Sequence, residues 1–390
     1  MTYVLNPSVE KVSAPPISES AEWLKGNRSN LPAINLSQAV PSYPPAPELA
    51  AHTASCLIDN SANLYTDILG TPELRSELAS NMSQAYAGTV RAEDVAITAG
   101  CNQAFCSVIQ SIAGKGDNII LTSPWYFNHQ MWLNMQGIEI RTISAMKDGS
   151  ALPDPADLAT VCDDRTRALI LISPNNPTGA IYPPSLIDRF FDTCKSHKIA
   201  LVLDETYKDF LDAGSPPHNL FQRPDWRDTF IQLYSFSKVY ALTGSRVGSA
   251  IAGPALIEAM EKVIDCIAIC APHSGQKAAL FGLQHLEAWK QSKRELMNTR
   301  LVAMQTAFAR HAPMYKIMSS GAFFAYLQHP FINHPAKDIA KALAQQSGVL
   351  TLPGTMFGRD QDRFLRLAFA NVEADYMEDA AKRLAAFSPE

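Results

Sequence analysis

The sequence predicts an α/β fold, in which helices cover a parallel or mixed sheet, together with a smaller α+β domain. Three observations lead to this prediction. Between about residues 94 and 253, short β-rich runs alternate with segments of helical periodicity. Several of these runs are nearly continuous apolar stretches, which is typical of strands buried on both faces. The third observation is length, because 390 residues exceed the usual size of a single hydrophobic core.

The elements of the larger part can be assigned in chain order. Residues 1–45 are rich in proline and serine, and we expect an arm and a loop there. Seven β-rich runs follow, over 94–100, 118–124, 138–144, 167–174, 200–205, 230–237 and 247–253. Helical patterns lie between them, for example over 183–197 and 255–265. Ligands of such sheets bind beyond the carboxyl ends of the strands, so we expect the functional site there.

The rest of the chain predicts a second, smaller α+β domain. A long helical pattern runs from about residue 275 to 310. After it come a strand-like run, a helix, two more strand-like runs and a final helix, over 321–328, 336–347, 349–354, 364–370 and 373–387.

Composition and charge disfavour several classes of function. The net charge of −5, without any run of Lys or Arg, disfavours nucleic-acid binding. The longest apolar runs, such as 168–172, are too short to span a bilayer, and the N-terminus has no signal-peptide pattern. Seven cysteines without a C-x-x-C pair predict reduced, mostly buried thiols in a cytoplasmic protein. No zinc-ligand pattern is present, so we predict no metal site. Because the apolar runs are short, we also predict no membrane partner.

The segment SFSKVYALTGSR, residues 235–246, carries the most specific chemistry. Lys238 follows a predicted strand, and no other charged residue lies between Asp228 and Arg246. A lysine attacks a carbonyl only through its neutral amine, and burial or a nearby cation raises the neutral fraction. A solvated lysine at a strand end is the alternative. Hydroxyls, lysine and arginine in this order predict a lysine imine with a phosphate-bearing cofactor, pyridoxal 5'-phosphate.

A phosphate site is predicted beside this lysine. The planar guanidinium of Arg246 suits a dianion, and the hydroxyls of Ser235 and Ser237 can fill the remaining acceptor sites. A surface ion pair is the alternative for Arg246. The neighbouring Gly244 and Gly248 instead indicate a tight backbone approach.

A second phosphate contact is predicted at Gly100, Cys101 and Asn102. Here the strand-like DVAITAG ends and a helical pattern begins. The free N–H groups and the positive dipole end of a helix N-terminus bind anions.

Asp204 is the candidate partner of the cofactor's ring nitrogen. A carboxylate there keeps the nitrogen protonated, which makes the ring an electron sink. Glu205 points to the opposite face of the strand, and the pattern does not choose between the two acids. Tyr207 and Asn176 are expected to hydrogen-bond the ring's phenolic oxygen, although a well-made turn also explains the segment N-N-P-T-G.

Two further residues complete the predicted site. Tyr126 is a candidate for stacking on the cofactor ring; Trp125 is its rival, and core packing is the alternative for both. Arg366 is a cation flanked by apolar residues, and a buried arginine needs an anionic partner. That partner is either a substrate carboxylate or an internal acid. Arg363, in a more polar stretch, is expected to be solvated.

Six motifs together resemble a known family. They are YTDILGTPELR (65–75), ITAGCNQA (97–104), SPNNPTG (173–179), DETY (204–207), SFSKVYALTGSRVG (235–248) and RLAFA (366–370). Each is weak evidence alone, but in this order they resemble the class I and II aminotransferases, which are fold-type I pyridoxal 5'-phosphate enzymes. The resemblance extends from about residue 30 to the C-terminus.

The resemblance implies a fold and an oligomeric state. It implies a large cofactor-binding domain over 46–280, built around a mostly parallel seven-stranded sheet. A small α+β domain would combine the arm and substrate-side loop of 1–45 with residues 281–390. A homodimer with active sites at its interface is also implied, in which Tyr65 would reach the phosphate in the partner subunit.

The resemblance also implies a role for each site residue. Lys238, Asp204 and Tyr207 would form the catalytic set, and Lys238 would both carry the cofactor and move the proton. The other cofactor contacts would be Gly100, Cys101, Asn102, Tyr126, Asn176, Ser235, Ser237 and Arg246. Arg366 would hold the substrate α-carboxylate, with Asn176 and Ala39 beside it. Ala39 stands where the family commonly has glycine, so its methyl group is expected to narrow the pocket or shift the loop.

These residues can be interpreted as three kinds of function. The leading interpretation is an aminotransferase that moves an amino group from an L-amino acid to a 2-oxo acid, in a ping-pong cycle through pyridoxamine phosphate. The alternative is a β-elimination (C–S) lyase on the same scaffold, since the same residues serve both. A ligand-sensing regulator would need a basic DNA-binding segment, which the first ~35 residues do not provide. No arginine stands out for a second substrate carboxylate; hydrophobic or aromatic amino acids fit Tyr43, Tyr126 and Trp125 loosely.

Overall fold

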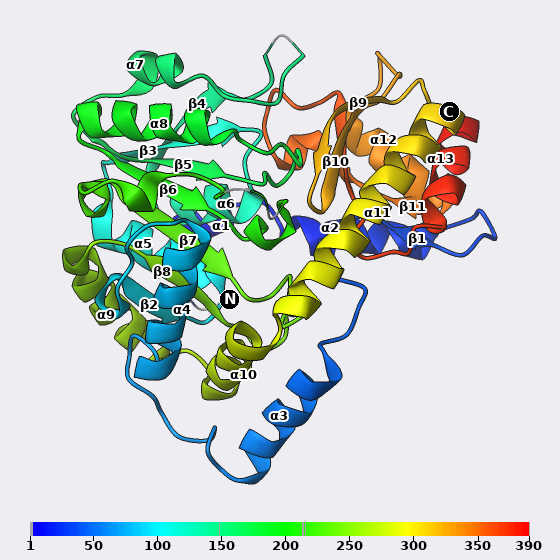
Figure 1. The fold of residues 1–390 in the computed structure, drawn as a ribbon. Helices are drawn as coiled ribbons and strands as arrows, with labels where there is room; N and C mark the ends of the chain where they lie inside the picture. Colours follow the sequence, from blue (N-terminus) through cyan, green and yellow to red (C-terminus); the bar gives the residue numbers. More distant parts are fainter. Residues whose placement is uncertain (1–2, 148, 213, 215, 390) are drawn as a thin grey trace.

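A seven-stranded sheet forms the centre of the computed structural model, which describes residues 3–389 except 148, 213 and 215 (Figure 1). Its strand order is β2-β8-β7-β6-β5-β3-β4. The strands are β2 (Val95–Thr98), β3 (Asn118–Ser123), β4 (Glu139–Ser144), β5 (Thr166–Ile172), β6 (Ala200–Asp204), β7 (Phe230–Ser235) and β8 (Gly248–Ile251). Only β8 runs antiparallel to its neighbours, β2 and β7. The predicted mostly parallel sheet is therefore confirmed.

Helices cover both faces of this sheet. One face packs against α5 (Cys101–Ile112), α6 (Phe127–Gln136) and α9 (Pro254–Ala268). The other packs against α4 (Pro72–Ala85), α8 (Pro184–His197) and α10 (His273–His285), with α3 (Pro47–Ile58) lying on α10.

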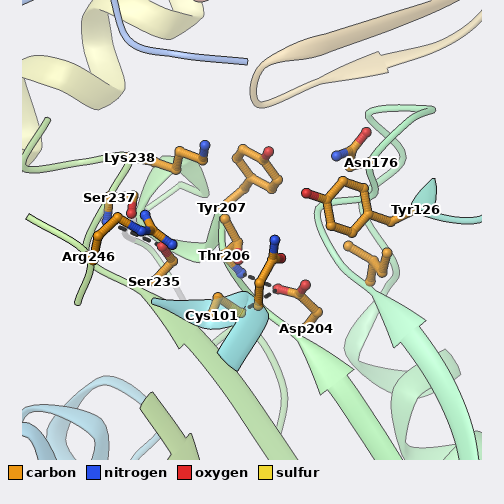
Figure 2. Close-up of a pocket in the computed structure, with 12 residues that line it drawn as sticks. Cys101, Tyr126, Asn176, Asp204, Thr206, Tyr207, Ser235, Ser237, Lys238 and Arg246 are labelled. Carbon is orange, nitrogen blue, oxygen red and sulfur yellow. Dashed lines mark hydrogen bonds between the residues drawn. The ribbon is translucent and has the colours of Figure 1, made fainter. Parts of the chain in front are cut away.

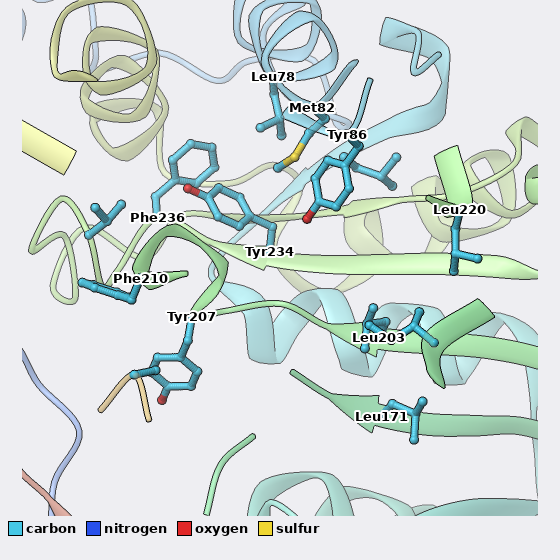
Figure 3. Close-up of a cluster of buried hydrophobic side chains, with 14 of the residues drawn as sticks. Leu78, Met82, Tyr86, Leu171, Leu203, Tyr207, Phe210, Leu220, Tyr234 and Phe236 are labelled. Carbon is cyan, nitrogen blue, oxygen red and sulfur yellow. The ribbon is translucent and has the colours of Figure 1, made fainter. Parts of the chain in front are cut away.

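The two apolar clusters explain why the strands read as continuous apolar runs. Leu201 and Leu203 of β6 belong to the cluster under α4 and α8, whereas Val202 between them belongs to the opposite cluster. Successive side chains of a strand point to opposite faces, so both faces need apolar residues. Figure 3 shows part of the first cluster, which includes Met82 of α4 and Tyr234 of β7.

A smaller α+β unit is built from both ends of the chain. Its antiparallel sheet has the order β12-β13-β10-β9 and comprises β9 (Lys316–Gly321), β10 (Phe324–Gln328), β12 (Leu352–Pro353) and β13 (Phe364–Ala368). Strand β1 (Ile34–Asn35) pairs in parallel with β11 (Val349–Leu350), which joins the N-terminal segment to the C-terminal elements. A separate apolar cluster unites them with α11 (Glu287–His311), α12 (Ala336–Ala342) and α13 (Tyr376–Ala386).

The long helical pattern over 275–310 is interrupted, so the expectation of one helix is wrong. The chain forms α10 and α11, with a break at Leu286, whose φ is −112° and ψ is 34°. Helix α10 packs on α3 and α4, whereas α11 packs on α13 and contributes Met304 and Phe308 to the smaller unit. The later part of α11 thus belongs to the smaller unit, whereas α10 and Met297 of α11 belong to the core of the large sheet.

The N-terminal arm also contains more structure than expected. It forms α1 (Pro7–Glu10) and α2 (Pro16–Trp23), each beginning at a proline. Proline suits a first helical position because its φ is already helical and that N–H has no intrahelical partner.

Two expectations from composition can be compared with the described residues. No helix among them has the length and apolar character needed to cross a membrane. All seven cysteines are free, but only Cys56 and Cys194 are buried, and Cys266 is exposed. The expectation of mostly buried thiols is therefore wrong.

Candidate active site

Two adjoining cavities lie beyond the carboxyl ends of the central strands. The inner cavity, of about 170 Å³, is shown in Figure 2. Twelve residues line it: Cys101, Asn102, Tyr126, Ile172, Asn176, Asp204, Thr206, Tyr207, Ser235, Ser237, Lys238 and Arg246. The outer cavity, of about 410 Å³, shares several of these residues and adds Ala39 and Arg366. Strands β5, β6 and β7 end here, so segments far apart in sequence meet.

Lys238 borders both cavities. Its Nζ donates a hydrogen bond to the Ala39 carbonyl at 2.9 Å, and its own carbonyl accepts one from the Tyr43 hydroxyl at 2.9 Å. Burial, together with the nearby Arg246 cation, lowers the pKa of Lys238 to about 8. A substantial fraction of the amine is therefore neutral near physiological pH, as a nucleophile or base requires.

The anion-binding end of the inner cavity is shaped by glycines. A Cβ on Gly100 would lie 2.1 Å from Nη2 of Arg246 and would displace this guanidinium, and the φ of +86° itself favours glycine. A Cβ on Gly248 would lie 2.6 Å from the backbone nitrogen of Cys101, so the predicted tight approach is found there. It is not found at Gly244, which faces open space, and that part of the prediction is wrong.

Helix α5 begins at this same end. Gly100 is its N-cap and supplies no side-chain cap, so the first N–H groups of α5 stay available to a ligand. Figure 2 shows Ser235, Ser237 and Arg246 together at one end of the cavity, and Tyr126 and Asn176 at the other. The arrangement separates a phosphate-like end from a ring-like end.

Asp204 lies at the end of β6, on the floor of the inner cavity. Its Oδ1 accepts the Thr206 N–H at 3.0 Å and lies 3.7 Å from Sγ of Cys101. Its Oδ2 lies 3.7 Å from Nε2 of His129. Burial raises the pKa of Asp204, although the hydrogen bonds from Thr206 oppose this. A desolvated carboxylate of this kind gains from a cationic N–H donor.

The adjacent Glu205 points away from the cavity into the core. Its Oε2 accepts hydrogen bonds from the Tyr86 hydroxyl at 2.9 Å, from Gln232, and from Nε2 of His218 at 3.2 Å. Nδ1 of His218 accepts the Leu220 N–H at 3.1 Å, which assigns the ring proton to Nε2. The structure thus resolves the choice that the sequence left open, with Asp204 on the cavity side.

Three residues in or beside the inner cavity were missed from the sequence. Ile172, the last residue of β5, lines the cavity. Thr206 lies between two predicted residues and binds Asp204. His129 is buried and stacks on Phe105 with ring centroids 3.8 Å apart; burial lowers the pKa of His129 to about 3, so its ring is neutral. The only signal for His129 was its position three residues after Tyr126, on the first turn of a helix.

Arg366 is buried at the boundary of the outer cavity. Its Nη1 donates to Oδ1 of Asn176 at 3.0 Å, its Nη2 donates to the Ser37 carbonyl, and its Nε has no partner. The rings of Phe324 and Phe357 each lie 5.0 Å from the guanidinium, and burial lowers the pKa of Arg366 to about 10. No ion pair to an acid forms among residues 3–389 as described, so the internal-acid alternative finds no support.

The remaining predicted residues fall in different places. Tyr126 borders both cavities, whereas its rival Trp125 lines a separate cavity beside Arg359. Tyr65 is 77% exposed and lies outside both cavities. Arg363 is half-buried and donates to the His329 carbonyl at 2.9 Å, so the expectation that it is solvated is wrong.

The groups around the inner cavity fit pyridoxal 5'-phosphate. An anion-binding end, a buried carboxylate and a lysine amine of lowered pKa surround one space, and Oδ2 of Asp204 has no donor closer than 3.7 Å among the described side chains. These match the phosphate, the ring nitrogen and the aldehyde of this cofactor. Fold and site together define a pyridoxal 5'-phosphate-dependent enzyme of fold type I.

Comparison with known proteins supports the assignment to a pyridoxal 5'-phosphate enzyme. The profile of the family Aminotransferase class I and II matches residues 32–384. An aspartate aminotransferase of Sulfurisphaera tokodaii is 28% identical over 344 residues, 85% of this chain and 84% of that protein. An arginine–pyruvate transaminase of Pseudomonas aeruginosa is 27% identical, over 87% of this chain and 86% of that protein. A solved Thermus thermophilus aspartate aminotransferase is 25% identical and superposes with a TM-score of 0.89, covering 98% of this chain and 99% of its own.

The chain therefore belongs to the class I and II aminotransferase family. It is an aminotransferase that uses pyridoxal 5'-phosphate to move an amino group from an amino acid to a 2-oxo acid by the family's ping-pong cycle.

Proposed function

We propose that the inner cavity holds the cofactor, that the outer cavity holds the amino acid, and that Lys238 is the base that moves the substrate proton. The observation that carries the proposal is the position of Lys238 at the boundary of both cavities, with a pKa near 8. An amine there can reach the cofactor on one side and the substrate Cα on the other.

The ring end of the cofactor is assigned to four side chains. When bound, pyridoxal 5'-phosphate supplies an aldehyde and an electron-withdrawing ring, which acidify the Cα–H of an attached amino acid. Asp204 accepts the ring N–H with Oδ2. Tyr207 donates its hydroxyl to the ring oxygen, and Asn176 donates its Nδ2, because its Oδ1 is already bound by Arg366. Tyr126 stacks on the ring.

The phosphate end is assigned to the glycine-lined part of the inner cavity. Arg246 supplies the charge and a planar set of donors, and Ser235 and Ser237 supply hydroxyls. The N–H groups of Cys101 and Asn102, at the start of α5, complete the site. Gly100 takes part by leaving room for the guanidinium.

The substrate lies between Arg366 and Lys238. Arg366 binds the α-carboxylate, which places Cα near Nζ of Lys238. Lys238 would take the proton from Cα and hold it at Nζ, and general-base help of this kind is worth about a hundred- to ten-thousand-fold in rate. Ala39 borders the same space. Relative to the glycine common in the family, its methyl group would narrow the pocket or shift the loop.

We also propose a cytoplasmic homodimer in which Tyr65 reaches the phosphate in the partner subunit. Exposed apolar side chains support this: Ile58 is 87% exposed, Leu64 69% and Tyr65 77%. They lie on α3 and the loop after it, and large apolar side chains exposed in one short segment are consistent with a protein interface. The free cysteines fit a reducing compartment. Light scattering of the purified protein tests the dimer.

A division into domains at about residues 45 and 280 is part of the proposal. It is supported by an apolar cluster confined to the large sheet and its helices, by another in the smaller unit, and by the pairing of β1 with β11. Hydrogen exchange that divides the chain at about these residues into two cooperative units is the expected result.

An amino-acid panel tests the proposed function. Addition of an amino acid to the holoenzyme should bleach the absorbance of the lysine-bound cofactor, and a 2-oxo acid should restore it. Release of ammonia and pyruvate without a 2-oxo acid would instead indicate the β-elimination lyase, and would contradict the proposal.

A further inference from the structure

The outer cavity contains a part that no cofactor contact occupies, which we call the side-chain subsite. It is lined by Pro15, Ile17, Gln38, Val40, Phe127 and Asn128. Four of these residues are apolar and two end in a neutral carboxamide, so none carries a charge.

The apolar wall of this subsite is built into the fold. Phe127 at the start of α6 is buried and packs with Leu352 and Phe357 of the smaller unit, and Ile17 of α2 packs against the same cluster. Asn128 is oriented by a hydrogen bond from its Nδ2 to the Tyr126 hydroxyl at 3.1 Å. The wall therefore exists before any substrate binds, and a side chain entering it loses contact with water.

Every charged residue that lines the outer cavity already has a task in the proposed reaction. Arg246 binds the phosphate, Arg366 binds the α-carboxylate, and Lys238 acts as a neutral amine. The described lining contains no Asp or Glu. A second carboxylate would thus meet no cation of this subunit in the subsite, and a basic side chain would meet no anion of it. Burial of an unpaired charge against apolar groups is strongly unfavourable.

We propose that the side-chain subsite selects amino acids with uncharged, mainly apolar side chains, such as leucine, methionine or phenylalanine, over dicarboxylic and basic amino acids. This inference rests on the proposed function, because it uses the assignment of Arg366 to the α-carboxylate. The proposed selectivity differs from that expected of several relatives, which are named aspartate aminotransferases.

Single-turnover kinetics of the full-length holoenzyme test the selectivity. We expect kcat/KM for the best uncharged amino acid to exceed the values for aspartate, glutamate, arginine and lysine by about a hundredfold or more, because rejection of an unpaired buried group is a large effect. A value for any of these charged amino acids within tenfold of the best uncharged one would overturn the inference. The inference would also be overturned if a second subunit supplied the missing charge, and the assay detects this because the enzyme is tested in its own oligomeric state.

Calorimetry with unreactive carboxylates tests binding to the side-chain subsite independently of the reaction. We expect the holoenzyme to bind 4-methylpentanoate, with one carboxylate and an apolar tail, at least tenfold more tightly than succinate, with two carboxylates. Tighter binding of succinate would overturn the subsite assignment. Absence of any half-reaction across the panel would overturn the proposed function instead, and the calorimetric comparison would still decide the subsite.

A variant pair tests the electrostatic basis. Gln38→Lys places a cation at the subsite, and Gln38→Met keeps a similar length without charge. We expect kcat/KM for glutamate to be at least tenfold higher in Gln38→Lys than in Gln38→Met, with leucine affected to a similar extent in both variants. Equal glutamate values in the two variants, with holoenzyme spectra like the wild type, would contradict the electrostatic argument.

Discussion

Replacement of Arg366 by lysine tests how the substrate is held. The guanidinium is fixed by Asn176 and by the Ser37 carbonyl, and it is flanked by two aromatic rings, so its orientation is set before substrate arrives. Lysine keeps the positive charge but presents a single ammonium group instead of a planar fork. It can therefore pair with a carboxylate but not through two parallel hydrogen bonds.

The size of the effect follows from the hydrogen bond that lysine cannot make. One charge-assisted hydrogen bond contributes about 1.5–3 kcal/mol, so removing one of the two to the α-carboxylate should lower kcat/KM about tenfold to two-hundredfold. The carboxylate is bound both in the ground state and in the transition state. Most of the decrease should therefore appear as a higher KM, with a smaller change in kcat.

The assay compares an amino acid with the amine that lacks its carboxylate. Arg366→Lys should weaken the half-reaction of the amino acid and leave that of the amine within about threefold of wild type. Arg363→Lys is the matched control, because Arg363 precedes the same strand, binds the His329 carbonyl and lies outside both cavities. Equal decreases for the amino acid and the amine would refute the assignment of Arg366 to the α-carboxylate, and thermal unfolding shows whether the variant is folded.

The site and its supporting core can be tested by four further experiments. Lys238→Ala should abolish both turnover and borohydride-trapped cofactor, measured by mass spectrometry; retained turnover would exclude Lys238 as the base. The rate at which pyridoxal 5'-phosphate attaches to the apoenzyme should rise with pH and level off above about pH 8, because only the neutral amine attacks and the pKa of Lys238 is about 8; a rate independent of pH in stopped-flow absorbance would argue against this. Gly248→Ala should weaken cofactor binding in a fluorescence titration, because its Cβ would lie 2.6 Å from the Cys101 nitrogen. Gly244→Ala is the control, and it should bind the cofactor like the wild type because Gly244 faces open space. His218→Phe should lower the free energy of unfolding by about 1–3 kcal/mol in urea, because it removes one donor from the buried Glu205; an unchanged unfolding midpoint would contradict that role.

The strands of the large sheet could be predicted because their signal is local. Each is an apolar run buried on both faces, so its sequence differs plainly from the helices around it. The break at Leu286 could not be predicted in this way. No proline or glycine stands at the break, where Leu286 departs from helical geometry between a helix that packs on α3 and α4 and one that packs on α13. Strand β9 was missed for a related reason, since most of its residues are only half-buried and show no alternation.

The site residues could be predicted where they belong to motifs at strand ends. Lys238, Asp204 and Asn176 stand in such segments, and the parallel strands carry them to one edge. His129 has no such context, because its role depends on the packing of α6 against Phe105. A single histidine on a helix gives no signal until the helix is placed.

The choice between Asp204 and Glu205 shows how the core determines the chemistry of the cavity. The two acids are adjacent, so the strand must send one to each face. On the core face, Tyr86, Gln232 and His218 all donate to one oxygen of Glu205. These bonds hold the end of β6 against rotation, because a turn of the strand would leave three buried donors without an acceptor. Asp204 is consequently held toward the cavity, with Oδ1 bound by Thr206 and Oδ2 3.7 Å from Nε2 of His129. In the proposed function this Oδ2 would accept the ring N–H of the cofactor.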